Sequence, residues 1–206
     1  GNWTLYALFQ GWHGKMVERA GPGGEGNVID HFSDEAIQNY LRRFDSAFAE
    51  ADISGLRGFF NDSYEVDDAS GQANWTPELF AEFENRHGYD LREELPALFG
   101  EDDREKNRRV RSDYRETVSD LLLERFTDPW REWAHGKEAI IRNQAHGSPA
   151  NILDLYAASD IPETEGTDIL RAKFATSAAN ITGKRLVSSE SATWLNEHFR
   201  STLADV

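Results

Sequence analysis

The sequence predicts an α/β protein made of about five consecutive βα units, which we interpret as part of a (β/α)8 barrel of the TIM type. Short apolar runs alternate with longer segments whose apolar residues recur every 3.6 residues, a pattern typical of parallel strands joined by helices. The chain has 206 residues, fewer than the roughly 250 that a closed (β/α)8 barrel usually needs. A small, complete, doubly wound sheet is the alternative fold.

Five short apolar runs are the predicted strands. They cover residues 5–9, 56–60, 139–142, 157–160 and 186–188. The predicted helices cover residues 34–48, 77–86, 104–133, 150–156 and 169–181, and a last one carries Leu195, Phe199 and Leu203. Ser33 is a suitable N-cap for the first helix, Pro129 should kink or break the longest helix near Asp128, and Gly183 should end the fifth.

Composition narrows the classes of function. The chain has 37 acidic residues against 22 Lys and Arg, a net charge of −15, which argues against binding to nucleic acids or anionic membranes. The absence of cysteine excludes disulfides, thiolate nucleophiles and Cys-based metal sites. No apolar run approaches the roughly 18 residues of a membrane span. We find no internal linker, and we expect residues 1–206 to be a single-domain fragment of a longer protein.

Polar residues follow each predicted strand, where parallel α/β folds place their functional groups. Three of these strand ends carry carboxylates: Glu65, the pair Glu163 and Glu165, and Glu190. Hydrolysis of a glycosidic bond needs two carboxyl groups that face each other across the bond. Each glutamate taken alone is equally well explained as a helix cap or an ion-pair partner.

Aromatic residues near the same strand ends favour a sugar ligand, because apolar faces of sugars pack on indole rings. Trp12, Trp75 and Trp194 lie close to a predicted strand end or its loop, although core packing is the alternative explanation. The acidic group Asp62, Glu65, Asp67 and Asp68 offers the hard oxygen ligands that calcium prefers, but its spacing is not that of an EF-hand. The Gly-rich residues 21–26 lie too far from the preceding strand to bind a dinucleotide.

Four long segments resemble the α-L-rhamnosidases of glycoside hydrolase family 106. They are LFQGWHGKMVERAGPGGEGNVIDHFS (8–33), FFNDSYEVDDASGQANWTPELFAEFENRHGYDL (59–91), IRNQAHGSPANILDLYAASDIPETEG (141–166) and LVSSESATW (186–194). The resemblance implies a (β/α)8 catalytic barrel within a larger, multidomain bacterial enzyme that is extracellular or periplasmic. It also implies inverting hydrolysis of terminal α-L-rhamnosyl linkages in polysaccharides, with a calcium ion that helps to hold the sugar.

The resemblance also assigns roles to residues. Glu65 would be the general acid and Glu190 the general base, while Glu163 or Glu165 would be the calcium or substrate carboxylate. We expect the substrate-binding residues to be Trp12, His13, Asn61, Asp62, Asn143, His146 and Trp194. The expected partners are a carbohydrate substrate and the remaining barrel staves and accessory domains of the parent chain, with no nucleic acid and no membrane. A retaining glycosidase of another barrel family and a non-catalytic carbohydrate-binding domain are the alternative functions.

Overall fold

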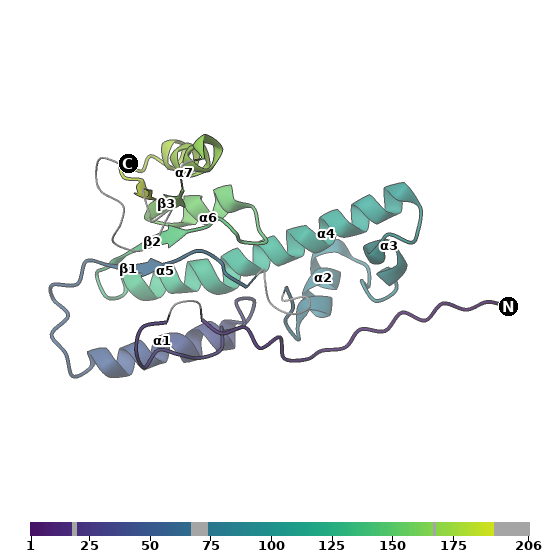
Figure 1. Ribbon diagram of the computed structural model, residues 1–206, viewed down its shortest axis with the longest axis horizontal. Coiled ribbons are helices and arrows are strands. Elements are labelled where there is room, and N and C mark those ends of the chain that lie inside the picture. Colours follow the sequence, from purple (N-terminus) through teal and green to yellow (C-terminus); the bar gives the residue numbers. More distant parts are fainter. Residues whose placement is uncertain (18–19, 67–73, 167, 192–206) are drawn as a thin grey trace, which may run out of the picture.

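The fold is built on a four-stranded parallel sheet whose strands lie side by side in sequence order (Figure 1). The computed structural model describes residues 1–17, 20–66, 74–166 and 168–191. The strands are β1 (Gly58–Asn61), β2 (Ile140–Gln144), β3 (Ile161–Glu165) and β4 (Ser188–Glu190). All three neighbouring pairs are parallel, as the alternation of strands and helices predicts.

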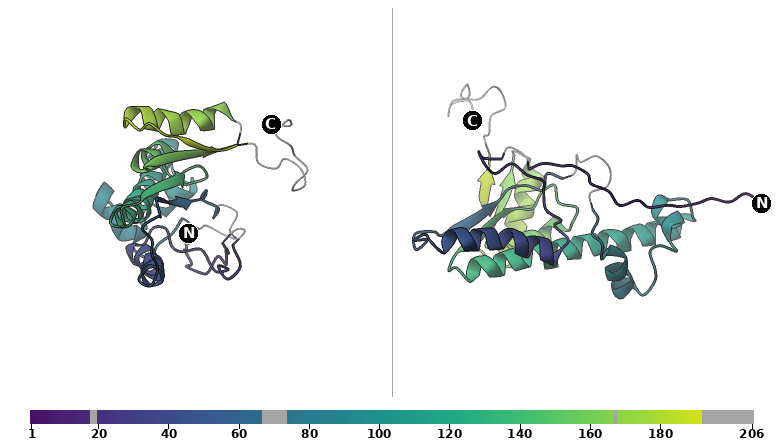
Figure 2. Two further views of the ribbon diagram at one scale, coloured as in Figure 1. Left: turned by 90° about the vertical axis from the view of Figure 1, so that its left-hand side faces the viewer. Right: turned by 90° about the horizontal axis from the view of Figure 1, so that it is seen from below.

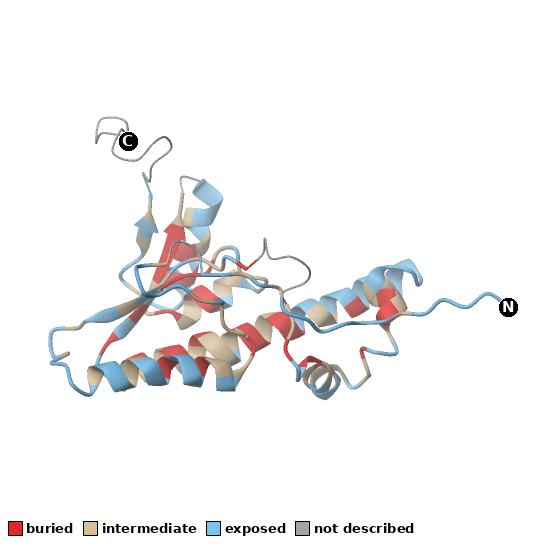
Figure 3. Cartoon of the chain, turned by 60° about the horizontal axis from the view of Figure 1, so that its bottom comes forward, coloured by how far each residue is buried: buried red, intermediate tan, exposed pale blue. Residues whose placement is uncertain are grey.

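Helices pack against the sheet and bury its apolar side chains. The helices α1 (Asp34–Phe48) and α5 (Asp128–His135) form a cluster with β2, in which Ile141 is fully buried. The helices α6 (Ile152–Ala158) and α7 (Ile169–Ile181) contact each other and β3. Figure 3 shows the buried residues concentrated where strands and helices meet, whereas the N-terminal segment is exposed.

A helical insertion separates β1 from β2. It contains α2 (Leu79–His87), α3 (Leu95–Phe99) and α4 (Arg104–Leu122), and α4 runs from the insertion back to the sheet (Figures 1 and 2). A separate apolar cluster of Phe83, Leu91, Ala97 and Val110 forms its core. The helix α3 was not among the predicted elements, because five residues are too few to show a helical period.

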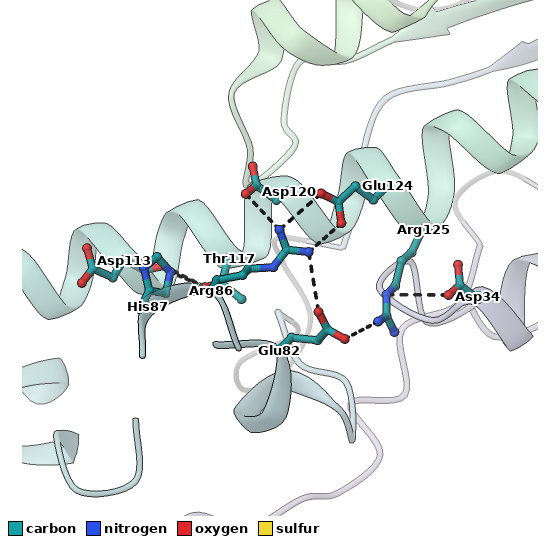
Figure 4. A network of polar contacts seen from close by, with 9 residues as sticks. All are labelled: Asp34, Glu82, Arg86, His87, Asp113, Thr117, Asp120, Glu124 and Arg125. Atoms are coloured by element: carbon teal, nitrogen blue, oxygen red, sulfur yellow. Dashed lines mark hydrogen bonds and ion pairs between the residues drawn. The ribbon is translucent and has the colours of Figure 1, made fainter. Parts of the chain in front are cut away.

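Charged side chains attach α2 to α4 and to the turn that follows α4 (Figure 4). The Arg86 guanidinium donates to Asp120 at 3.2 Å and to Glu124 at 3.2 Å. Glu82 lies between Arg86, at 3.6 Å, and Arg125, at 2.5 Å. These contacts link α2 to the helix that leads into the sheet.

The predicted helix over residues 104–133 is not broken by Pro129, and helical residues continue from Arg104 to His135. After α4, a π-helical turn (Leu123–Thr127) precedes α5, in which Pro129 stands in the first turn. Proline has no N–H, so it cannot donate to the carbonyl of Arg125 four residues earlier. The Asp128 N–H donates to the carbonyl of Leu123 instead, which widens the helix by one residue.

Two of the strand predictions are wrong. Residues 5–9 form no strand. Leu5 is 89% exposed and Phe9 is 92% exposed, while Tyr6 contacts Phe99 and donates to Glu101 in the insertion. A strand needs a hydrogen-bonded neighbour, and this segment runs past α3 rather than beside β1 (Figure 1).

The fourth predicted strand is displaced. Residues 157 and 158 complete α6, and β3 begins only at Ile161. The side chain of Asp160 instead accepts from the backbone N–H of Ile141, at 2.7 Å. The helices predicted at residues 34–48, 77–86, 150–156 and 169–181 are confirmed within about two residues, and the predicted last helix lies outside the described residues.

Within the described residues, no helix is both long enough and apolar enough to cross a membrane.

Candidate active site

One buried amide joins two carboxylates that come from different strands. The Nε2 of Gln144 donates to Oε1 of Glu163 at 2.9 Å and to Oε2 of Glu190 at 2.8 Å. Gln144 is 1% exposed and Glu163 is 3% exposed. A single amide group at the carboxyl end of the sheet therefore holds a carboxylate from β3 and another from β4.

The register of the sheet explains this cluster. Gln144 is the parallel partner of Glu163, and Glu165 is the partner of Glu190. Because paired residues project to the same face of a sheet, these side chains gather on one side. Arg142, two residues before Gln144 on the same face, donates to Oε2 of Glu163 at 2.8 Å and supplies the opposite charge.

A pocket of about 960 Å³ lies beside this cluster, between β1, β2 and the helices. Asn61 and Asn143 are paired across β1 and β2, with Asn61 Nδ2 donating to Asn143 Oδ1 at 2.9 Å. The residues predicted for the site that line this pocket are Asn61, Asp62, Glu65 and Asn143. Gln144 lines it too, so this residue belongs both to the pocket and to the carboxylate cluster.

His31 and Tyr64 belong to the aromatic lining of the pocket, with Tyr40, Phe44 and Phe126. The rings of His31 and Tyr64 lie 5.1 Å apart, and His31 also packs on Phe126 of the π-helical turn, at 4.8 Å. Burial lowers the pKa of His31 to about 4, because the surrounding apolar groups disfavour the charged imidazolium. Burial likewise raises the pKa of the neighbouring Asp30.

The structure places most of the predicted site residues in two groups rather than one, with Glu65 after the edge strand β1 and Glu190 in the opposite edge strand, β4. Glu65 and Asp62 lie in the pocket, whereas Glu163 and Glu190 belong to the cluster around Gln144. The Nε2 of His146 lies 2.5 Å from Oε2 of Glu165, and Glu165 is the strand partner of Glu190 in the cluster.

Several of these residues lie within strands rather than after them. Asn61, Asn143, Glu163, Glu165 and Glu190 all belong to strands, because each strand ends later than its apolar run predicts.

The two N-terminal members of the predicted site do not reach the pocket. Trp12 is 98% exposed, and the Nδ1 of His13 accepts from the backbone N–H of Lys15 at 3.0 Å. Neither residue is among those that line the pocket in the described part of the chain. Their segment does not pair with β1, so nothing holds them beside the strand ends. Trp194 lies outside the described residues.

Gln144, Arg142 and His31 have no role among the sequence-based predictions. Gln144 is the second residue after a predicted strand, in the same run as Asn143 and His146, and this position is the one signal that could have identified it. Arg142 lies inside the predicted strand, and His31 lies far from any strand end, so neither shows a comparable pattern.

Oxygen ligands for a hard cation are available in the cluster. The Oε1 of Gln144 is buried and has no hydrogen-bond partner among the described residues. It lies on the same side chain that contacts Glu163 and Glu190, and carboxylate and amide oxygens are the ligands that calcium prefers. A second group, His87, Asp113 and Glu116, lies on the insertion with ligand atoms within 4.8 Å of one another.

The chain is similar to known glycoside hydrolases. The sequence model of glycoside hydrolase family 106, described as alpha-L-rhamnosidase, matches residues 1–205. The solved structure of a rhamnosidase from Novosphingobium sp. PP1Y is similar, with a TM-score of 0.71 and 28% identity over 84% of this chain and 18% of that one.

A curated protein from Formosa agariphila, provisionally named a beta-glucuronidase, is 28% identical over 204 residues. The match covers 94% of this chain and 17% of that protein, so the chain spans less than a fifth of the relatives that it matches. With a family match that extends over nearly its whole length, the chain belongs to glycoside hydrolase family 106.

Proposed function

We propose that this chain supplies the acid and the base of an inverting α-L-rhamnosidase. The observation that carries the proposal is the buried Gln144, which joins Glu163 to Glu190 at the carboxyl end of a parallel sheet and also lines the pocket that contains Glu65. Parallel α/β enzymes place their active sites at this end of the sheet. The four strands would then be consecutive staves of a (β/α)8 barrel whose other staves come from the rest of a longer protein.

Glu65 is the proposed general acid. Glu65 lines the pocket, as does Asp62, and its carboxyl group would there protonate the oxygen of the departing group. The hydroxyl of Ser63 donates to Oε1 of Glu65 at 3.5 Å.

Glu190 is the proposed general base. Gln144 presents only a donor to it, which leaves the carboxylate as an acceptor for the proton of the attacking water. In an inverting enzyme the two catalytic carboxyl groups are about 6.5–9.5 Å apart, whereas about 5–5.5 Å would indicate the retaining alternative.

We expect a calcium ion at Glu163 or Glu165, where it would orient sugar hydroxyl groups. The buried Oε1 of Gln144 and the oxygen ligands of the cluster support this expectation. Removal of calcium by a chelator should abolish activity on rhamnosides, and calcium should restore it. Full activity after exhaustive chelation would contradict the expectation.

The expected substrates are terminal α-L-rhamnosyl groups of polysaccharides, and the expected location is outside the cytoplasm. The Formosa agariphila relative makes a glucuronide the useful comparison substrate. Faster hydrolysis of a β-glucuronide than of an α-L-rhamnoside would refute the assignment of substrate.

The decisive experiment changes each proposed catalytic residue separately in the full-length protein. Glu65→Gln should lower kcat/KM about 100- to 10,000-fold on an alkyl rhamnoside and less on a nitrophenyl rhamnoside, because a good leaving group needs less protonation. Glu190→Gln should slow both substrates alike, because the base acts on water. If neither variant loses tenfold, neither residue is catalytic, and a reversed pattern would exchange the two roles.

A further inference from the structure

The turn after β2 touches the backbone of the loop that carries Glu65. Gly147 has a φ of +78°, and a Cβ at this residue would lie 2.9 Å from the carbonyl oxygen of Tyr64. A carbon atom at that distance overlaps the oxygen, and the atom it meets is backbone rather than the end of a flexible side chain. Only glycine meets both requirements at this position.

The side chain of Tyr64 is packed against other residues, so Tyr64 cannot move as a whole away from Gly147. The Tyr64 ring packs on His31, and His31 packs on Phe126 in the π-helical turn. Tyr64 also contacts the main apolar cluster that contains Leu155 and Tyr156. A substitution at Gly147 that pushes on Tyr64 would therefore displace the chain at the next residue, Glu65.

We propose that Gly147 is a positioning residue for Glu65. The absence of a side chain at Gly147 sets the position of the proposed acid relative to the end of β2. The inference rests on the proposed function of Glu65. The close approach of Gly147 lets the loop after β1 lie directly against the turn after β2, so that Glu65 and Gln144 line the same pocket. A misplacement of a catalytic group by about 1 Å can cost about 100-fold in rate.

The test compares Gly147→Ala with Gly183→Ala in the full-length protein. Gly183 has a φ of +69°, and a Cβ there would meet nothing within 4 Å. Both variants place a side chain at positive φ, which is strained for any residue other than glycine, but only Gly147→Ala pushes on Tyr64. Gly183→Ala therefore controls for the cost of positive φ alone, and a larger loss of thermal stability in Gly147→Ala reflects the contact with Tyr64. The two variants should also differ in catalysis.

Gly147→Ala should lower kcat at least tenfold on an alkyl rhamnoside and clearly less on a nitrophenyl rhamnoside, with a smaller change in KM. That dependence on the leaving group is the signature of a displaced acid, and Gly183→Ala should show none of it. Equal losses on both substrates, or losses no larger than those of Gly183→Ala, would overturn the inference.

Two further results keep the inference separate from the function on which it rests. If Glu65→Gln itself shows no dependence on the leaving group, the proposed acid is wrong and Gly147 cannot position it. If Gly147→Ala does not fold, Tyr64→Ala decides the question, because it releases the loop from the aromatic side. That variant should show the same dependence on the leaving group, and equal losses on both substrates would refute the positioning role.

Discussion

Replacement of Gln144 by leucine should destabilise the protein by about 3 kcal/mol. The change removes the donor that Glu163 and Glu190 share, and a hydrogen bond to a charged group contributes about 1.5–3 kcal/mol. Glu163 keeps its contact with Arg142, and Glu190 is only partly buried, so water replaces part of the loss. At about 2–4 °C per kcal/mol for a chain of this size, the melting temperature should fall by roughly 6–12 °C.

Replacement of Gln144 by glutamate keeps the shape of the side chain but replaces its N–H donor with a carboxylate oxygen, which is an acceptor at neutral pH. At neutral pH the introduced carboxylate faces two others, so the variant should be at least as unstable as Gln144→Leu. When the pH falls, the folded state binds a proton more readily than the unfolded state does, and the protonated carboxyl group becomes a donor again. The deficit relative to the wild type should therefore shrink between pH 7 and pH 5, whereas that of Gln144→Leu should not.

Urea unfolding followed by tryptophan fluorescence at the two pH values measures both effects. Gln38→Leu, on the exposed side of α1, is the matched control and should change stability by less than about 0.5 kcal/mol. The reasoning fails if Gln144→Leu behaves like this control. It also fails if acidification enlarges the deficit of Gln144→Glu.

Two further predictions concern stability. Burial lowers the pKa of His31 to about 4, so the unfolded state binds a proton at this residue first as the pH falls below 6.5. The free energy of unfolding of the wild type should therefore fall by about 2 kcal/mol more than that of His31→Phe between pH 7 and pH 5. Parallel losses in the two proteins would contradict this. Arg86→Met should cost about 2 kcal/mol in urea unfolding, because it leaves Asp120 and Glu124 without their shared partner, and 1 M NaCl should reduce the difference. Arg92→Met, at an exposed pair with Asp90, should cost little, and equal costs for the two arginines would refute the role given to Arg86.

Sequence alone determined the features that depend on neighbouring residues. Ser33 accepts from the N–H of Ala36 as an N-cap, and the helix that follows has the predicted extent. The irregularity expected near Asp128 occurs as a π-helical turn directly before that residue, although this form was not predicted and the helix is not broken. The alternation of strands and helices also predicted parallel strands in sequence order, because such connections return each strand to the same direction. The long segments that resemble family 106 identified the family that the comparison with known proteins confirms.

Tertiary structure alone decided which residues pair across the sheet. Hydrogen bonds between strands join residues far apart in the chain, so an apolar run such as residues 5–9 cannot show whether it has a neighbour. For the same reason the strand predicted at residues 157–160 was placed too early in the chain. The polar residues of Ile161–Glu165 become a strand only through their partners in β2 and β4. The role of Gln144 as a shared donor likewise depends on pairing between strands. Its partners Glu163 and Glu190 lie 19 and 46 residues away, and only the register of three strands brings their carboxylates to one amide.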